Sequence, residues 1–255
     1  MRIDTQSSSE SPRELVVLVH GSVTDGQETW QEQRSLSQAY VVLTPDRQGY
    51  GVGASEHADD PKADAATIGG LLGQGAHLVG YSMGGLVAML AAAGRPEAVK
   101  SLVLVEPVAF DLVRGRADVE GFIAGYERLH ASSPDAEGFL REFLVFAGND
   151  PVEVAQIPDP MPDGLHNGAV ALYTGAAPWD VPTPVDELAA ATFPIVVVSG
   201  GHSAMFDAIC DVLAERVGAE RVVIPGAGHA VQYTGQPFNA LLKSTWESAA
   251  SHSEA

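Results

Sequence analysis

Six short runs of apolar, largely β-branched residues constrain the fold of this 255-residue chain more than any other feature. The apolar residues in each run are consecutive rather than alternating, which is typical of strands buried on both faces of a sheet. The runs lie at residues 15–19, 40–43, 77–79, 101–105, 194–198 and 221–224. They predict a central, mostly parallel sheet.

Helix-like stretches separate several of these runs, and they lie at residues 67–72, 84–93, 204–217 and 237–249. This alternation of strands and helices favours an α/β layered fold. After Pro107 the alternation stops, because the following segment contains helical material and a Pro- and Gly-rich loop but no convincing strand. We therefore expect an α/β core with an inserted helical cap and two flexible tails. The expected boundaries are 1–13 for the N-terminal tail, 14–107 and 193–248 for the core, 108–192 for the cap and 249–255 for the C-terminal tail.

The charge balance limits which kinds of partner the chain can bind. It has 33 acidic and 14 basic residues, a formal net charge of −19. Such a surface repels phosphate backbones and anionic lipids, so we expect a small-molecule substrate and neither nucleic-acid nor membrane partners. Cys210 is the single cysteine and can form no intramolecular disulfide. The first residues lack a secretory signal pattern, so we expect a cytoplasmic monomer or homodimer.

The most specific motif is Gly80-Tyr81-Ser82-Met83-Gly84, which directly follows one apolar run and directly precedes a helix-like stretch. A G-x-S-x-G sequence at a strand-to-helix turn holds its serine on a tight elbow, and the glycines allow neighbouring elements to approach. The helix that begins behind Ser82 directs its positive end toward any oxyanion formed there. The motif therefore predicts a nucleophilic serine.

Together with this elbow, three other segments make the chain resemble the α/β-hydrolase superfamily over nearly its whole length. His20-Gly21-Ser22 follows the first strand, where that family carries its oxyanion turn, and residues 46–51 resemble its D-x-x-G-x-G turn. Gly226-Ala227-Gly228-His229 follows the last predicted strand, where the family carries its catalytic histidine. The resemblance implies a cofactor-independent serine hydrolase with the backbone amides of Ser22 and Met83 as the oxyanion hole.

A serine hydroxyl is a weak nucleophile at neutral pH and needs an adjacent imidazole to take its proton. His229 is the predicted base. His20 is the main competitor, although the resemblance implies that its role is to support the oxyanion turn.

The third member of the triad departs from the usual pattern of the family. The family usually carries an Asp in a Gly-x-x-Asp turn at a position where this chain reads Gly200-Gly201-His202-Ser203. Family members with that gap can take the acid from the end of the strand that follows the nucleophile helix, which here is Glu106. A carboxylate that ends an apolar run is costly to bury without a partner, which also favours Glu106. Asp207 is the alternative acid.

The substrate pocket and any bound ion are less well determined by the sequence. The aromatic and aliphatic content of the cap indicates a largely apolar pocket. The candidate lining residues are His20, Tyr81, Phe146, Met161, Trp179 and His202. We find no metal-binding or nucleotide-binding motif and expect neither metal nor cofactor, and we interpret Asp59, Asp60 and Asp64 as a solvated acidic loop.

These features predict a hydrolase of a small or medium, largely apolar ester, lactone or thioester that works through an acyl-enzyme. Several alternatives stay open, because the fold hosts many functions. A C–C bond hydrolase, a perhydrolase or a lyase or cyclase of secondary metabolism can keep the same triad. A non-catalytic ligand-binding protein can keep the same pocket.

Overall fold

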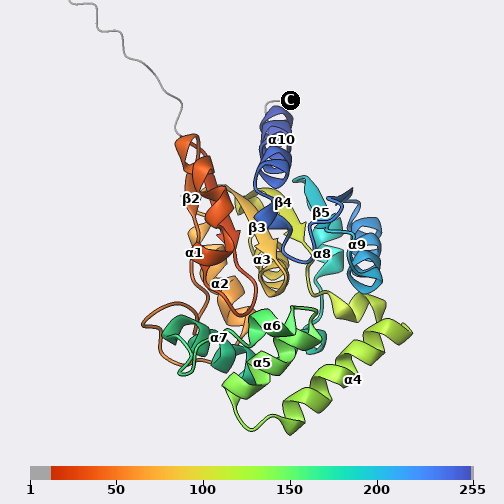
Figure 1. Ribbon diagram of the computed structural model, residues 1–255. Helices are drawn as coiled ribbons and strands as arrows, with labels where there is room; N and C mark the ends of the chain where they lie inside the picture. Colours follow the sequence, from red (N-terminus) through yellow and green to blue (C-terminus); the bar gives the residue numbers. More distant parts are fainter. Residues whose placement is uncertain (1–12, 254–255) are drawn as a thin grey trace, which may run out of the picture.

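Over residues 13–253, the part of the chain that the computed structural model describes, six strands form one sheet in the order β2-β1-β3-β4-β5-β6 (Figure 1). All the neighbouring pairs are parallel. The strands are β1 (Leu15–Val19), β2 (Val41–Leu43), β3 (Ala76–Tyr81), β4 (Val99–Val105), β5 (Ile195–Ser199) and β6 (Glu220–Val223). The predicted α/β fold with a mostly parallel sheet is therefore confirmed.

Helices surround this sheet. They are α1 (Gly26–Thr29), α2 (Pro61–Leu71), α3 (Met83–Gly94), α4 (Ala117–Ser132), α5 (Ala136–Phe146), α6 (Pro151–Val154), α7 (Asp163–Thr174), α8 (Val185–Ala189), α9 (Ala204–Val217) and α10 (Gln236–Ser253), with short 3-10 helices η1 (Gln31–Gln38), η2 (Pro96–Ala98), η3 (Phe110–Val113), η4 (Pro178–Asp180) and η5 (Val231–Thr234).

Both faces of the sheet are buried, as the consecutive apolar runs predict. In β1, Val17 and Val19 belong to an apolar cluster that includes residues of α2, α3, α8 and α9. Val16 and Leu18 belong to a second cluster on the opposite face, which includes residues of η1 and α10. Because successive side chains of a strand point to opposite faces, one apolar run supplies both clusters.

Two helix boundaries differ from the prediction. Helix α2 begins at Pro61 rather than at residue 67, because the Asp60 carboxylate accepts hydrogen bonds from the amides of Lys62 and Ala63 and Pro61 occupies the first turn. Helix α10 continues to Ser253, past the predicted start of the C-terminal tail at residue 249. Apart from Arg13, the predicted N-terminal tail lies outside the described residues, as do residues 254–255.

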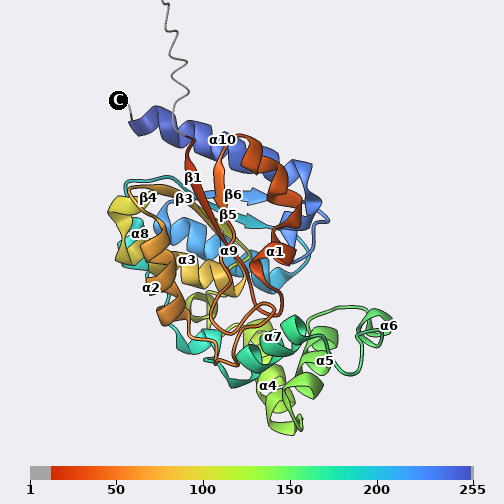
Figure 2. The same cartoon turned by 90° about the vertical axis from the view of Figure 1, so that its left-hand side faces the viewer.

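Residues 108–192 are helical wherever they are regular. Figure 2 shows α4 to α7 gathered at one end of the molecule, opposite the end that α10 occupies. Helix α8 falls inside the predicted cap boundaries, but its Val185 and Leu188 side chains belong to the apolar cluster of the core. Val119 and Ile123 of α4 belong to the same cluster, so this packing does not set a boundary between cap and core. We use "cap" below for α4–α7, which lie together at one end of the molecule.

Within the described residues, no helix combines the length and the apolar composition that crossing a membrane requires.

Candidate active site

Ser82 lies at a sharp turn between β3 and α3, with a φ of 53° and a ψ of −120°. A non-glycine residue rarely adopts a positive φ, so surrounding contacts must hold it there. Two glycines make the turn possible. A Cβ on Gly84 would overlap the carbonyl oxygens of Val19 and His20, and a Cβ on Gly80 would overlap the carbonyl of Gly84. The close contact between β1, β3 and α3 therefore needs both glycines of the motif.

A continuous series of hydrogen bonds joins three side chains at this turn. His229 Nδ1 lies 2.7 Å from Glu106 Oε2, and His229 Nε2 lies 3.1 Å from Ser82 Oγ. An ionised carboxylate only accepts hydrogen bonds, so Nδ1 carries the imidazole proton and Nε2 is free to accept from the serine hydroxyl. The structure thus brings together the predicted nucleophile, the predicted base and the first of the two predicted acids.

Glu106 follows directly after β4 and has a φ of 41°. Its backbone amide donates to the Val198 carbonyl at 2.9 Å, which ties this turn to the neighbouring strand β5. The side chain has no exposed surface, and its Oε1 accepts a 2.7 Å hydrogen bond from the Gly200 amide. Hydrogen bonds of both its backbone and its side chain therefore hold Glu106 in place, with Oε2 directed at His229.

Asp207, the alternative acid, is engaged elsewhere. Its Oδ1 accepts a 2.6 Å hydrogen bond from the Ser199 hydroxyl and lies 3.2 Å from Arg221 Nη2. Ser203 caps α9, so Asp207 sits one turn into the helix, where it pairs with the end of β5 and with β6. The structure therefore contradicts Asp207 as the acid that orients His229.

The turn after β1 lies against Ser82. A Cβ on Gly21 would lie 3.0 Å from the Tyr81 ring and 3.2 Å from Ser82 Cβ, so a larger residue here would require Tyr81 or Ser82 to shift. His20 is fully buried beneath the turn, and its Nδ1 donates to the Gly21 carbonyl at 2.7 Å. Burial lowers the pKa of His20 to about 3, so this imidazole is neutral at physiological pH. His20 therefore supports the turn instead of lining a pocket, and it makes no contact with the Ser82 hydroxyl.

The amides of Ser22 and Met83 are placed beside the nucleophile by this turn and by the first residue of α3. Within the described residues neither amide donates a hydrogen bond to a protein acceptor. Free amides at the start of a helix and in an adjacent turn are the donors that an oxyanion hole needs.

The remaining predicted pocket residues divide into two groups. Near the site, the Tyr81 ring lies 5.0 Å from the His229 ring, and His202 Nδ1 lies 3.3 Å from Glu106 Oε1. Burial raises the pKa of the Tyr81 hydroxyl, which keeps it neutral beside the imidazole. Trp179 is half-buried and packs against Phe110 at 6.0 Å between ring centroids.

Phe146 and Met161 do not lie at the triad. Phe146 is 39% exposed and packs against the Phe122 ring of α4. Met161 is buried inside the cap, in an apolar cluster with Phe139 and Leu140. The sequence places both in the cap, but Phe146 ends α5 against Phe122, and Met161 lies in the segment between α6 and α7, where it packs inside the cap.

Sequence reasoning missed Phe206. Its ring centroid lies 4.5 Å from that of His229, closer than any other aromatic ring in the described part of the chain, and 6.3 Å from that of Phe110. Phe206 occupies the first turn of α9, directly after the loop that contains His202. The sequence contained one signal for Phe206, because this residue follows a loop at the end of a predicted strand. Such loops meet at the active-site edge of a parallel sheet.

The acidic loop is also different from the prediction. Asp59 and Asp64 are buried and both pair with the Arg47 guanidinium, while Asp60 caps α2.

Elsewhere in the described residues, Glu106, His202 and His229 bring potential metal ligand atoms within 4.8 Å of one another. Two of these three already form the hydrogen bond between imidazole and carboxylate described above, so we assign no metal to the group.

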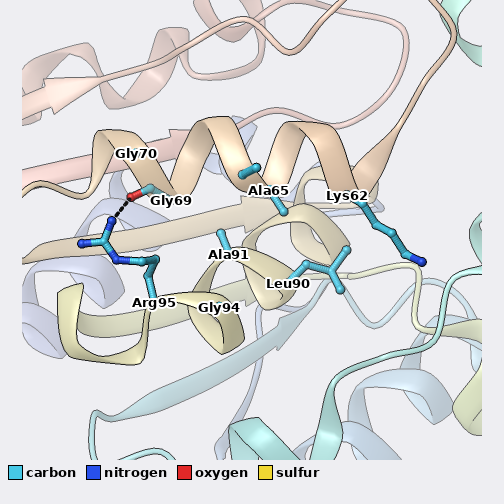
Figure 3. Close-up of a pocket in the computed structure, with 9 residues that line it drawn as sticks. Lys62, Ala65, Gly69, Gly70, Leu90, Ala91, Gly94 and Arg95 are labelled. Carbon is cyan, nitrogen blue, oxygen red and sulfur yellow. Dashed lines mark hydrogen bonds between the residues drawn. The ribbon is translucent and has the colours of Figure 1, made fainter.

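A surface groove of about 500 Å³ lies between α2 and α3, away from the triad (Figure 3). Small residues form its floor, and Lys62 and Arg95 stand at its edges, with an Arg95 hydrogen bond to the Gly69 carbonyl at 3.4 Å. None of the residues that line the groove belongs to the site around Ser82.

Comparison with known proteins identifies the family of the chain. The sequence profile described as "Alpha/beta hydrolase family" matches residues 16–241. Among curated proteins, the chain is 29% identical to the dihydrolipoyllysine-residue acetyltransferase component of an acetoin cleaving system from Cupriavidus necator, over 90% of this chain. It spans only 63% of that protein's length.

Two further relatives carry the names of ester-cleaving enzymes. The chain is 27% identical to lipase LipV from Mycobacterium tuberculosis, over 85% of this chain and 86% of that protein. A thermophilic esterase from Thermogutta terrifontis, solved with malate bound, has the same fold, with a TM-score of 0.68 and 24% identity over 91% of this chain and 90% of that one.

Proposed function

The chain belongs to the alpha/beta hydrolase family, and from that premise we propose that it is a hydrolase that cleaves a small or medium, largely apolar ester, lactone or thioester with Ser82 as nucleophile. The observation that carries this proposal is the unbroken hydrogen-bonded series from Ser82 through His229 to Glu106. This arrangement is the one that acyl transfer requires of a serine, a general base and an orienting carboxylate.

In the proposed mechanism, His229 Nε2 takes the hydroxyl proton as Ser82 Oγ attacks the carbonyl carbon of the substrate. The negative charge that develops on the carbonyl oxygen is stabilised by the amides of Ser22 and Met83. Glu106 keeps the imidazole in the tautomer with a proton on Nδ1 and stabilises the imidazolium that forms.

The tetrahedral intermediate then collapses, the bond from carbon to the leaving oxygen or sulfur breaks, and His229 gives its proton to the leaving group. Water attacks the resulting acyl-enzyme with His229 again as base, which releases the carboxylic acid and regenerates Ser82. With a lactone both products are parts of one hydroxy acid.

A row of aromatic rings beside the base supports an apolar substrate. Phe206 packs against His229, Phe110 against Phe206, and Trp179 against Phe110. The net charge of −19 disfavours the approach of anionic substrates. The name of the lipase relative supports an ester as the substrate.

The test is hydrolysis of a series of p-nitrophenyl esters of increasing acyl length, with Ser82→Ala measured beside the wild type at the same protein concentration. We expect the wild type to release p-nitrophenol and the variant to show only the background rate. The dependence on acyl length then gives the size of the apolar site. Equal rates for the two proteins would contradict the proposal.

A further inference from the structure

The turn that follows β1 contains an unusual backbone conformation. Val23 has a φ of 83°, a region that β-branched residues rarely occupy. A residue held in such a conformation stays there only when its surroundings hold it, and such residues concentrate at functional sites. Val23 directly follows Ser22, whose amide is a proposed oxyanion donor.

Cap helix α7 provides the first contact that holds this turn. A Cβ on Gly168 would overlap the Val23 carbonyl, so the backbone of α7 rests directly against that peptide group. The side chain of Val23 also packs against the apolar cluster inside the cap, which includes Phe139 and Leu172. Val23 is thus enclosed by the cap on its carbonyl side and on its side-chain side.

A second connection runs from α7 to the other end of the turn. The Asp59 amide donates to the Ala171 carbonyl of α7 at 3.1 Å, and the Asp59 carboxylate pairs with Arg47. Arg47 Nη1 then donates to the Gly21 carbonyl at 3.1 Å. All three charged side chains of this network, Arg47, Asp59 and Asp64, are buried, and a buried charge left without its partner is costly.

The Gly21 carbonyl and the Ser22 amide belong to one planar peptide unit. Whatever fixes the direction of that carbonyl also fixes the direction of the Ser22 N–H. His20 and Arg47 both donate to the carbonyl, and the α7 contact fixes the following residue, Val23. We propose that α7 holds the oxyanion turn in its working orientation, with Gly168 and Val23 as positioning residues for the Ser22 amide; this inference rests on the proposed hydrolase function.

Gly168→Ala tests the inference, because the added methyl group pushes against the Val23 carbonyl. Gly164→Ala is the matched control, since it lies on the same helix and its Cβ would meet nothing closer than 3.5 Å. We expect kcat for a p-nitrophenyl ester to fall by about 10- to 100-fold in Gly168→Ala with KM nearly unchanged, because complete loss of an oxyanion donor typically costs more than this. Gly164→Ala should keep the wild-type values of both constants.

Hydrogen–deuterium exchange provides a readout that does not depend on activity. We expect the hydrogen-bonded amides of Arg47 and Asp59, which connect the turn with α7, to exchange about fivefold faster in Gly168→Ala than in Gly164→Ala. Val23→Gly is a second variant, because glycine adopts this φ without strain but loses the side-chain contact with the cap. Its Arg47 and Asp59 amides should likewise exchange faster, and its kcat should be lower.

Wild-type kcat in both Gly168→Ala and Val23→Gly would overturn the inference, as would exchange of the Arg47 and Asp59 amides that matches the control. A wild-type protein without Ser82-dependent turnover would instead contradict the proposed function. In that case the exchange data alone would decide whether α7 holds the turn.

Discussion

The carboxylate of Glu106 lies between two histidines and a backbone amide. His229 donates to one oxygen, while the Gly200 amide and the ring of His202 face the other. A buried carboxylate with these neighbours has one preferred orientation, and that orientation is passed to the imidazole through Nδ1. In the proposed mechanism this contact decides which nitrogen of His229 is free to take the serine proton.

Glu106→Gln tests this role. The amide NH₂ group of glutamine can face Nδ1 and stabilise the other tautomer, so we expect kcat to fall by about 10³-fold or more while KM changes little. Asp207→Asn is the comparison, and it should stay within about threefold of the wild type because Asp207 pairs with Ser199 and Arg221. Steady-state kinetics on one ester measures both variants, and the opposite ranking would make Asp207 the acid.

From the sequence alone, the place of a single side chain in the site can be predicted only where a motif puts that residue at the end of a predicted strand. Ser82 and His229 meet that condition, and the structure places them within hydrogen-bonding distance. Phe206 and Asp207 do not, because which of them faces the site depends on where α9 begins and how it is rotated. The Ser203 cap fixes that start, and a cap contact cannot be distinguished from a loop serine in one sequence.

At the scale of elements, the elbow between β3 and α3 depends on how closely α3 approaches the sheet. The first turn of α3 lies against the carbonyl groups at the end of β1 and the beginning of the oxyanion turn. Gly84 in α3 thus brings the nucleophile turn into contact with the turn that carries a proposed oxyanion donor.

Gly84→Ala should therefore destabilise the protein. The added methyl group would overlap the carbonyls of Val19 and His20, and we expect a loss of about 1–3 kcal/mol in the free energy of unfolding. Gly94→Ala at the other end of α3 is the matched control, because its Cβ would meet no atom within 4 Å. Urea unfolding of both variants gives the comparison, and equal midpoints would show that the close approach is not needed.

Strands were more predictable than helices. Each run of consecutive apolar residues gives its strand to within one or two residues. The inner strands are largely buried on both faces, which explains their runs, whereas the edge strands β2 and β6 are partly exposed. The start of α2 could be predicted only from the Asp60-Pro61 capping signal. The sequence does not show whether a charged residue in a turn is exposed or paired. The pairing of Arg47 with Asp59 and Asp64 could therefore be recognised only from the structure.

Considered as a whole, the molecule places its chemistry where the core sheet meets the cap. The triad comes from the ends of three core elements, whereas the turn that carries the Ser22 amide is in contact with α7. This division means that changes in the cap can alter catalysis without changing any residue of the triad. The groove between α2 and α3 lies outside this arrangement.

The most direct test of the account is covalent labelling with a fluorophosphonate, followed by intact mass measurement and peptide mapping. An activated serine attacks such a reagent, whereas an ordinary hydroxyl does not. We predict one adduct on the wild type, located on Ser82, and none on Ser82→Ala. An unlabelled wild type, or an adduct on another residue, would contradict the claim that Ser82 is the nucleophile.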